Sequence, residues 1–213
     1  MVRMICLANS IRHDGRCVAG IDIQTGEWIR PVPPAGGGIP SFRTIFNNNQ
    51  LSILDVVALQ VNRPLLNTRF QRENRVMPNW NWQVVDTVTP QEVTEYCEDT
   101  SPILYSLDDN VSPQTLEQIP ANEWKSLQLV RPRNLSFERD YWNTNRWRAR
   151  FRDGDGNEYY LKITDPVICD RLGRNEHIGP NCLLTVSLTE PWAPDDGSKP
   201  ELCYKLVAGV IEL

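Results

Sequence analysis

Histidine is scarce in this chain, and the short motifs of common enzymes are missing. The 213 residues include only two histidines, and there is no Gly-x-Ser-x-Gly, no phosphate-binding glycine-rich loop and no His-Glu-x-x-His. His13 lies in a polar stretch beside Asp14, and His177 lies in 174–180. An enzyme would need one of them in a pocket beside an acid or a nucleophile, and neither has such a partner at a recognisable spacing. We therefore expect a protein that is not an enzyme and has no cofactor.

Metal sites and disulfides are not indicated either. The six cysteines are scattered, without a Cys-x-x-Cys pair and without histidine at metal-ligand spacing, which favours reduced and mostly buried thiols. The stretch 153–158 resembles a calcium loop, but Glu158 and Thr164 stand where that loop needs glycine and an acid. A hairpin turn explains this stretch better, so we expect no metal.

Long apolar runs are absent. No stretch approaches the roughly 18 to 20 apolar residues that cross a bilayer as a helix. The apolar stretch that follows Met1 is shorter than a signal peptide requires. These features predict a soluble, cytoplasmic protein without a membrane partner.

Basic residues are missing from one stretch of the chain. The formal net charge of −5 argues against nucleic acid, because lysine and arginine supply most of the non-specific affinity for phosphate. However, nine of the 27 acidic residues lie between Asp86 and Glu123, where there is no lysine or arginine. The remainder has 22 basic and 18 acidic residues, so an acidic segment separates two mildly basic halves.

The two halves repeat one order of strands. A hairpin-like stretch, 17–32, precedes the apolar run 53–65, and 147–164 likewise precedes 182–192. Five short strands, with a central hairpin and an irregular or helical segment before the fourth, fit an OB fold, and an SH3-like barrel fits nearly as well. We predict a mainly β protein with two small OB-like β-barrels in tandem and a short helical connector. The predicted boundaries are 1–88 for the first barrel, 89–125 for the acidic, partly helical connector and 126–213 for the second barrel.

Turn and capping residues mark the ends of these elements. The stretch 9–15 is polar and turn-prone, and Gly26 suits a tight hairpin turn. Thr89 and Ser112, each followed by proline, are typical of helix starts. The expected strands are 4–7, 18–23, 27–32, one ending at Arg63-Pro64, and 82–88, then 127–130, 147–151, 158–163, 183–188 and 204–211, with a helical turn at 167–172.

Several short motifs resemble one known family. Leu7-Ala-Asn-Ser10, Gly15-Arg-Cys-Val-Ala-Gly20 and Glu27-Trp-Ile-Arg-Pro-Val32, with Trp147-Arg148 and Ile163-Thr-Asp-Pro166, are similar to the dual OB-containing domain family of bacteria. The resemblance spans nearly the whole chain and is more distinctive in the first half. It implies two OB folds, a nucleic-acid or nucleotide-like ligand and an association with prokaryotic conflict systems. It supplies no catalytic or binding residues.

Arginine and aromatic side chains are interleaved in the second half. The stretch 131–152 holds seven arginines and five aromatic residues against two acids. Arginine neutralises phosphate and stacks on bases, and an aromatic face accepts any base, as a single-strand binding surface requires. In a strand the arginines would share one face, which also describes an ordinary solvated face over a barrel core. The candidate ligand contacts here are Trp142, Arg146, Arg148 and Arg150.

Trp28 and Arg30 are the candidate pair of the first half. They lie two residues apart and therefore on one face of a strand. If that face is exposed, it makes a stacking platform with a phosphate clamp, which Arg12, Arg16 and Arg43 could extend from loops. If it faces inward, Trp28 belongs to the core and Arg30 packs along it.

For five other residues we favour a structural role over a role in ligand binding. We interpret Asn9 and Ser10 as turn residues that bond their own backbone. Trp80 and Trp82 share a face and are expected in the core or in an interdomain contact. Asp165, which precedes a proline, is expected in a turn.

These observations predict a non-enzymatic protein that binds nucleic acid or a nucleotide-like ligand. Single-stranded nucleic acid is favoured over duplex. The acidic connector would fix the angle between the barrels or block a groove. The alternative is a protein-interaction module, because barrel faces and strand edges also receive peptides. One continuous groove of arginine and aromatic residues from both halves would favour nucleic acid, whereas isolated patches separated by acidic surface would favour a protein partner.

Overall fold

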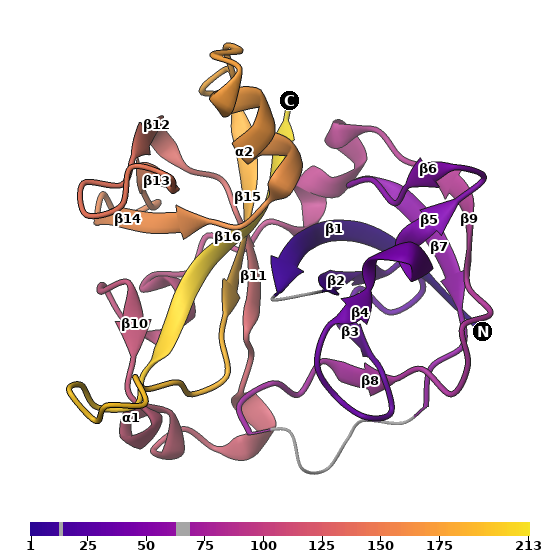
Figure 1. Ribbon diagram of the computed structural model, residues 1–213, viewed down its shortest axis with the longest axis horizontal. Coiled ribbons are helices and arrows are strands. Elements are labelled where there is room, and N and C mark those ends of the chain that lie inside the picture. Colours follow the sequence, from indigo (N-terminus) through magenta and orange to yellow (C-terminus); the bar gives the residue numbers. More distant parts are fainter. Residues whose placement is uncertain (13–14, 63–68) are drawn as a thin grey trace.

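The computed structural model describes residues 1–12, 15–62 and 69–213, and its strands form two barrels that lie against each other (Figure 1). The expected strand end at Arg63-Pro64 and the candidate His13 lie outside the described residues. The first half contains β1 (Val2–Arg12), β2 (Gly15–Asp22), β3 (Trp28–Val32), β4 (Ile39–Pro40), β5 (Ile45–Phe46), β6 (Asn49–Gln50), β7 (Asp55–Leu59), β8 (Asn74–Val76) and β9 (Gln83–Thr87).

The remaining elements belong to the connector and the second half. The strands are β10 (Asn110–Val111), β11 (Leu127–Val130), β12 (Arg133–Arg139), β13 (Trp147–Arg152), β14 (Glu158–Ile163), β15 (Cys182–Leu188) and β16 (Cys203–Glu212). The α-helices are α1 (Pro113–Glu117) and α2 (Pro166–Gly173). Short 3₁₀ helices cover Ser41–Thr44, Pro90–Tyr96, Ile103–Tyr105 and Ala121–Glu123.

The first barrel follows the strand order β8-β3-β2-β1-β7-β9. The two ends of this path, β8 and β9, follow each other in the chain, so the path returns on itself. The pairing of β3 with β8 is parallel, and the other pairings along the path are antiparallel. This is the OB order 1-2-3-5-4-1, with β7 as the fourth strand and the fifth strand divided into β8 and β9.

The second barrel has the same order, β11-β15-β16-β14-β13-β12. Here the first strand is divided, because Arg131 and Pro132 separate β11 from β12 and proline has no amide hydrogen for a ladder. The third and fifth strands, β14 and β16, are again parallel, and α2 lies between the third and fourth strands. The prediction of two OB-like barrels is confirmed.

The structure differs from the sequence-based expectations in two places: one expected turn is a strand, and one strand was not expected. Residues 9–12 do not form a turn, because β1 continues to Arg12, and Asn9 and Ser10 pair with Val18 and Cys17 of β2. Polar Asn9 fits this buried strand because its side-chain amide donates to the carbonyl of Leu51 at 2.6 Å. The strand β12 was missed. Its exposed arginines at both ends hide the alternation that marks a strand.

Asp165 is a helix cap. Its carboxylate accepts hydrogen bonds from the amides of Val167 at 3.0 Å and Ile168 at 3.3 Å, and so begins α2. Its other oxygen accepts from the amide of Val210 at 3.1 Å, which fixes α2 against β16. Burial raises the pKa of this carboxyl group above its ordinary value.

The acidic connector is packed mainly into the second barrel. Both helix starts are as predicted: Thr89 forms a capping box with Glu92, and the Ser112 hydroxyl accepts from the Thr115 amide at 3.1 Å. The connector also adds β10 to the edge of β16. Its apolar side chains join the hydrophobic core of the second barrel, namely Ile103, Leu104, Val111 and Leu116.

A buried lysine fastens this connector. Lys205 of β16 is 1% exposed, and its Nζ donates to the carbonyls of Ser106 at 2.5 Å and Asp108 at 2.8 Å. Burial lowers the pKa of Lys205 to about 8. The segment that carries Asp108 and Asp109 is therefore held against the second barrel.

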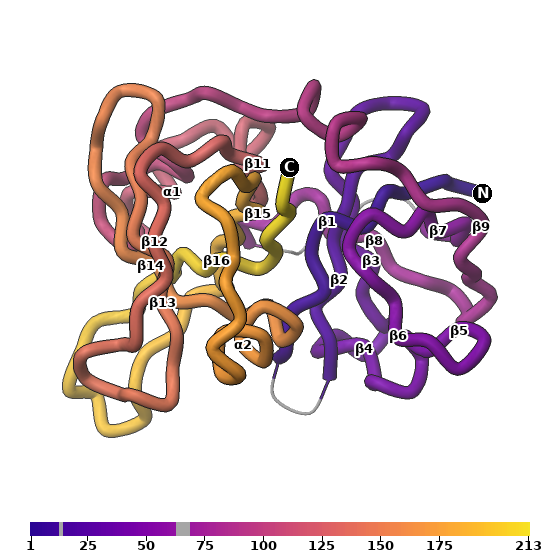
Figure 2. Tube along the Cα trace, turned by 90° about the horizontal axis from the view of Figure 1, so that it is seen from above, coloured from indigo at the N-terminus to yellow at the C-terminus, as the bar shows by residue number. Residues whose placement is uncertain are grey.

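The two barrels meet along a seam between β1 and β16 (Figure 2). A bulge in β1 lies between Cys6 and Ala8, and the carbonyl of Leu7 accepts a hydrogen bond from the Thr185 hydroxyl at 2.6 Å. The amide of Ile11 donates across the seam to the carbonyl of Thr164 at 3.2 Å. Apolar side chains from both barrels form one cluster there, including Ile5, Leu7, Ile21, Val56, Leu129, Leu183 and Ile211.

Candidate functional site

Arg30 lies inside the seam and not on a binding surface. It is 4% exposed, its Nη2 lies 3.4 Å from a carboxylate oxygen of Glu73, and it donates to the Ser187 hydroxyl at 3.2 Å. Trp28 is half-buried and packs against the same interface. The strand face that carries Trp28 and Arg30 therefore points inward, which was the second of the two alternatives considered from the sequence. The prediction that Arg30 contacts phosphate is wrong, because the guanidinium is buried and already paired.

The other basic candidates of the first half are dispersed. Arg12 and Arg16 lie in strands rather than loops, and Arg12 forms an ion pair with Glu190 of the second half at 2.8 Å. Arg43 is exposed and lies over the ring of Trp80, with 5.5 Å between its Cζ and the ring centroid. Trp82 is a core residue, as expected, and its indole nitrogen donates to the carbonyl of Arg43 at 3.0 Å.

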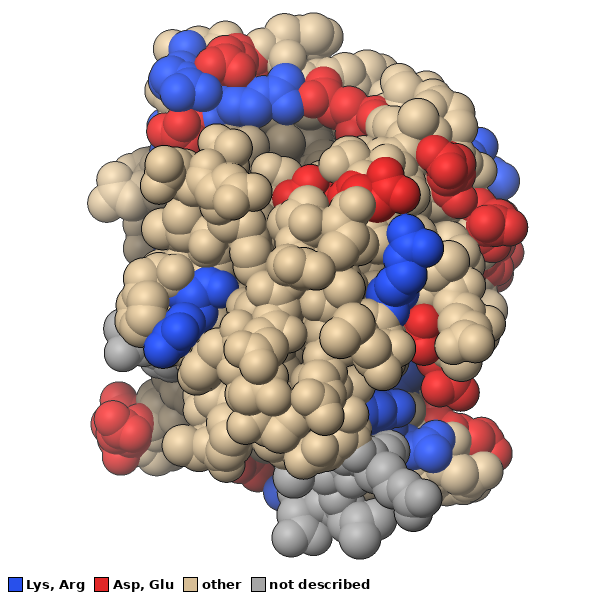
Figure 3. Space-filling view, turned by 90° about the vertical axis from the view of Figure 1, so that its right-hand side faces the viewer, with Lys and Arg blue, Asp and Glu red and all other residues tan. Residues whose placement is uncertain are grey.

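The outer face of the first barrel offers no basic track. Figure 3 shows a broad central area of this face without lysine or arginine, while charged side chains lie toward its margins. The exposed side chains of Phe42, Ile45 and Val85 are apolar. Among the described residues, lysine and arginine therefore form no continuous track across the face shown in Figure 3.

The alternation predicted for β13 is confirmed. Ala149 and Phe151 face the core, while Arg148 and Arg150 lie on the outer face. Arg152, next on that face, is exposed. This outer face belongs to β12, β13 and β14, which lie on the side of the second barrel away from the first in both views (Figures 1 and 2).

Neighbouring carboxylates hold two of these arginines. Arg148 Nε lies 2.7 Å from a carboxylate oxygen of Asp140. Arg150 bridges Glu138 at 3.1 Å and Glu158 at 2.5 Å. Much of the positive charge counted from the sequence is therefore balanced on the same face.

Two cations on this face have no such partner. Among the residues described by the structure, no carboxylate lies within ion-pair distance of Arg146 or Lys162. Lys162 pairs with Arg148 across the β13–β14 ladder. Burial and then the charges of Arg146 and Arg148 lower the pKa of Lys162, so the three cations are close enough to interact. They form a small electropositive cluster that could hold one phosphate group.

A hollow of about 330 Å³ lies beside this cluster, lined by Asp109, Trp142, Arg148 and Tyr160. Trp142 is 87% exposed, which is unusual for so large an apolar side chain. The guanidinium of Arg148 lies over the ring of Tyr160, 4.9 Å from its centroid, and donates to the Tyr160 carbonyl at 2.9 Å. Two aromatic side chains, a cation and a carboxylate therefore surround a space at the lower end of the range for small-molecule pockets.

Asp140 shapes the loop that carries Trp142. Its side chain accepts hydrogen bonds from the amides of Trp142 at 2.8 Å and Asn143 at 3.3 Å, and the residue is only 3% exposed. The hydrogen bond from Arg148 is the largest reason that the pKa of Asp140 lies below its ordinary value. One carboxylate thus orders both the loop and the arginine of the hollow.

We expect Asp140→Ala to lower the free energy of unfolding by about 1–3 kcal/mol, because several donors lose their buried acceptor. Urea unfolding at pH 7 measures the effect, with Asp155→Ala, an exposed acid of the next turn, as a control within about 0.5 kcal/mol. The folded-state pKa of Asp140 is depressed, so its contribution is present above about pH 4 and lost as pH falls further. A difference between wild type and variant that does not shrink in acid would contradict this role.

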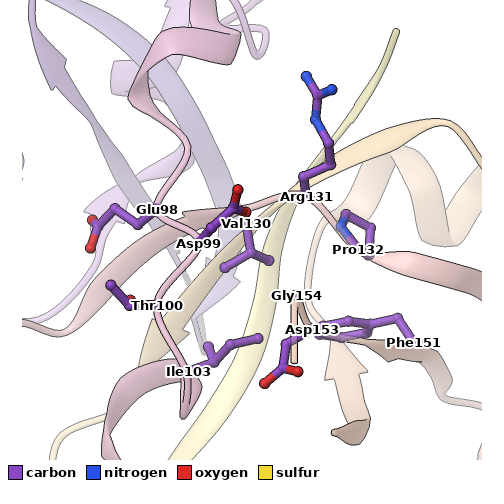
Figure 4. Close-up of a pocket in the computed structure, with 10 residues that line it drawn as sticks. All are labelled: Glu98, Asp99, Thr100, Ile103, Val130, Arg131, Pro132, Phe151, Asp153 and Gly154. Carbon is purple, nitrogen blue, oxygen red and sulfur yellow. The ribbon is translucent and has the colours of Figure 1, made fainter. Parts of the chain in front are cut away.

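A second, smaller cavity lacks the exposed aromatic side chain that lines the hollow. It has a volume of about 10 Å³, enough for one water, and lies between the connector and β13. In Figure 4 the side chains of Arg131 and Glu98 point away from it. Asp153 is already bonded to the Ser101 hydroxyl at 2.8 Å and the Asn157 amide at 3.2 Å. This cavity is a packing gap between the connector and the second barrel, at the edge of the 153–158 turn.

Sequence reasoning missed part of the hollow. Tyr160 was not a candidate, although the hairpin register places it directly opposite Arg150. Asp109 belongs to the acidic connector, which was expected to fix the angle between the barrels or block a groove, and was not a candidate. The signal for Lys162 was its place in the same hairpin, two residues after Tyr160.

The enzyme hypothesis gains little here. His177 is exposed after α2, and Glu212 is the acid near enough to interact with it. It lines neither of the two cavities described above. In the described part of the chain, no helix is long and apolar enough to cross a membrane.

The fold and the hollow together define a class of protein. Two barrels of OB strand order, with exposed aromatic and charged residues on strands two and three and the loop before them, are typical of OB-fold binding proteins. The chain belongs to the dual OB-containing domain family, whose model matches residues 2–210. No curated protein and no solved structure matches the chain.

Proposed function

We propose that this protein is a non-enzymatic binding protein whose second barrel holds a base and an adjoining phosphate of single-stranded nucleic acid, or a free nucleotide. The observation that carries the proposal is the hollow beside Trp142 and Tyr160. Aromatic faces stack on bases without sequence preference, and the exposed Trp142 is suited to this contact. The face is also the one that OB folds commonly use for oligonucleotides.

Phosphate contacts would come from Arg146 and Lys162. Because no described carboxylate pairs with them, they can neutralise phosphate without breaking an existing ion pair. Arg148 and Arg150 already form ion pairs with Asp140, Glu138 and Glu158. We therefore expect them to position the neighbouring side chains and not to be the main phosphate contacts. A site with two free cations predicts weak, salt-sensitive affinity for long strands and a preference for a short segment.

The experiment is a fluorescence-anisotropy titration with labelled single-stranded DNA, single-stranded RNA and duplex at two salt concentrations. We expect Trp142→Ala to weaken single-strand binding roughly 5- to 100-fold, because one base loses its stacking partner. Arg146→Ala should weaken binding and reduce the salt slope by about 0.7, the value for one phosphate of a single strand.

Phe42→Ala is the matched control, since Phe42 is an exposed aromatic residue, 66% exposed, on the first barrel. It should leave the affinity unchanged. Equal weakening by Phe42→Ala and Trp142→Ala would contradict a site on the second barrel, and no binding of any probe at low salt would exclude the general nucleic-acid function.

A protein partner remains the second candidate function. The paired arginines of β13 and the lack of basic side chains at the centre of the face shown in Figure 3 favour it by the criterion set from the sequence. Mixed charge around exposed Tyr141 and Trp142 is also typical of protein interfaces. The cytoplasmic location and the association with bacterial conflict systems, implied by sequence and family resemblance, fit either function.

A further inference from the structure

The hollow contains a carboxylate that phosphate binding does not explain. The side chain of Asp109 is 42% exposed, and its charge would repel a phosphate group. One of its oxygens accepts from the side-chain amide of Asn110 at 2.8 Å, and the other lies 3.6 Å from Arg148 Nη1. Each oxygen keeps a lone pair free, so the carboxylate can accept further hydrogen bonds from a ligand.

Asp109 is held rigidly although it belongs to the connector. Its backbone carbonyl accepts from the amide of Lys205 at 2.8 Å. The next residues, Asn110 and Val111, pair with Tyr204 and Cys203 of β16. The carboxylate therefore occupies a defined position beside the aromatic side chains that would stack a base.

An acceptor in this position distinguishes the four bases by their Watson–Crick edges. Guanine offers two adjacent donors, N1–H and the N2 amino group, which can bond both oxygens of a carboxylate. Adenine and cytosine offer one amino donor beside a ring-nitrogen acceptor, and uracil and thymine offer one N–H between two carbonyls. In unpaired strands these edges are what proteins read.

Arg148 supplies the complementary donors. Its Nε is used by Asp140 and one Nη1 hydrogen by the Tyr160 carbonyl, which fixes the plane of the guanidinium. The Nη2 hydrogens have no hydrogen-bond partner in the described residues. A guanine bound to Asp109 by N1–H and N2 presents its O6 acceptor on the same edge, and the guanidinium of Arg148 lies next to Asp109, with 3.6 Å between Nη1 and the carboxylate.

We propose that the hollow is a guanine-selective base site, in which Asp109 accepts from N1–H and N2 while Arg148 donates to O6. This inference rests on the proposed function, because it requires that the second barrel bind bases. Stacking on the exposed Trp142 supplies affinity for any base, and the Asp109 carboxylate supplies the selection. A site built for two donors rejects bases that lack one, because its own acceptor is then left unpaired.

The test uses labelled thymine strands with one central guanine, adenine or hypoxanthine, and matching uracil strands of RNA, in anisotropy titrations with the full chain. We expect guanine to bind at least tenfold more tightly than adenine. Hypoxanthine, which keeps N1–H and O6 but lacks the N2 amino group, should bind with intermediate affinity.

Asp109→Asn should bring guanine within about threefold of adenine. Asp108→Asn is the matched control, because it removes the same charge from an exposed neighbour that does not line the hollow. It should keep the guanine preference. Equal affinities in the wild type, or a preference that survives Asp109→Asn, would overturn the guanine assignment alone, whereas no binding of any strand would overturn the proposed function with it.

Discussion

Arg30→Ala should lower the free energy of unfolding by about 3–5 kcal/mol, the cost of breaking a buried ion pair by removing one partner. Glu73 would be left as an unpaired buried carboxylate, bonded to the Ser126 hydroxyl but without a cation. The Ser187 hydroxyl on the second barrel would lose its donor as well. The variant therefore weakens the seam between the barrels and not a ligand surface.

Urea unfolding followed by circular dichroism measures this loss. Arg43→Ala, which removes an exposed arginine of the first barrel, is the control and should change stability by no more than about 0.5 kcal/mol. Arg30→Met combined with Glu73→Gln should recover part of the loss, because no buried charge then remains alone. If Arg30→Ala is as stable as the wild type, then Arg30 is not buried as described.

Gly209→Ala is expected to disturb the seam at its closest point. A Cβ at Gly209 would overlap the backbone carbonyl oxygen of Leu7, and backbone cannot move aside as a flexible side chain can. That carbonyl is the one that accepts from Thr185, so the added methyl group also disturbs a cross-barrel hydrogen bond. We expect a loss of about 1–3 kcal/mol, the usual cost of overpacking, with weaker coupling between the barrels.

Gly173→Ala is the matched control, because no atom lies near the position that its Cβ would take. Calorimetry should show one cooperative transition for the wild type and for Gly173→Ala, and a lower or divided transition for Gly209→Ala. Unchanged stability and a single sharp transition in Gly209→Ala would mean that β1 and β16 do not approach as closely as described.

The order of strands was predictable from the sequence because local chemistry determines it. The hairpins at 17–32 and 147–164 and the capping residues Thr89 and Ser112 mark their elements directly. The division of one strand in each barrel was not predictable. It depends on which long-range neighbour each part pairs with, as at Arg131-Pro132.

Burial of Arg30 could not be read from the chain. Alternation places Trp28 and Arg30 on one face, but it does not say whether that face meets solvent or a second domain. The partners that make burial possible, Glu73 and Ser187, lie far away in sequence. The same holds for Asp109, whose position beside Trp142 arises from the pairing of β10 with β16.

The charge of the outer face of β12, β13 and β14 was also overestimated. Seven arginines in 131–152 indicate a strongly basic patch, but Asp140, Glu138 and Glu158 balance two of them on the folded surface. A strand brings side chains from its neighbours onto the same face, and these cannot be counted from one segment. For this reason Arg146 and Lys162 carry more of the proposed phosphate contact than Arg148 or Arg150.

We propose that ligand binds the outer face of the second barrel and not the seam. The most direct test is a titration of ¹⁵N-labelled protein with a short single strand, followed through the indole N–H signals of the seven tryptophans. We predict that the Trp142 signal shifts or broadens in proportion to bound ligand, while those of Trp28 and Trp82 stay in place. Movement of the Trp28 signal with an unchanged Trp142 signal would contradict the account.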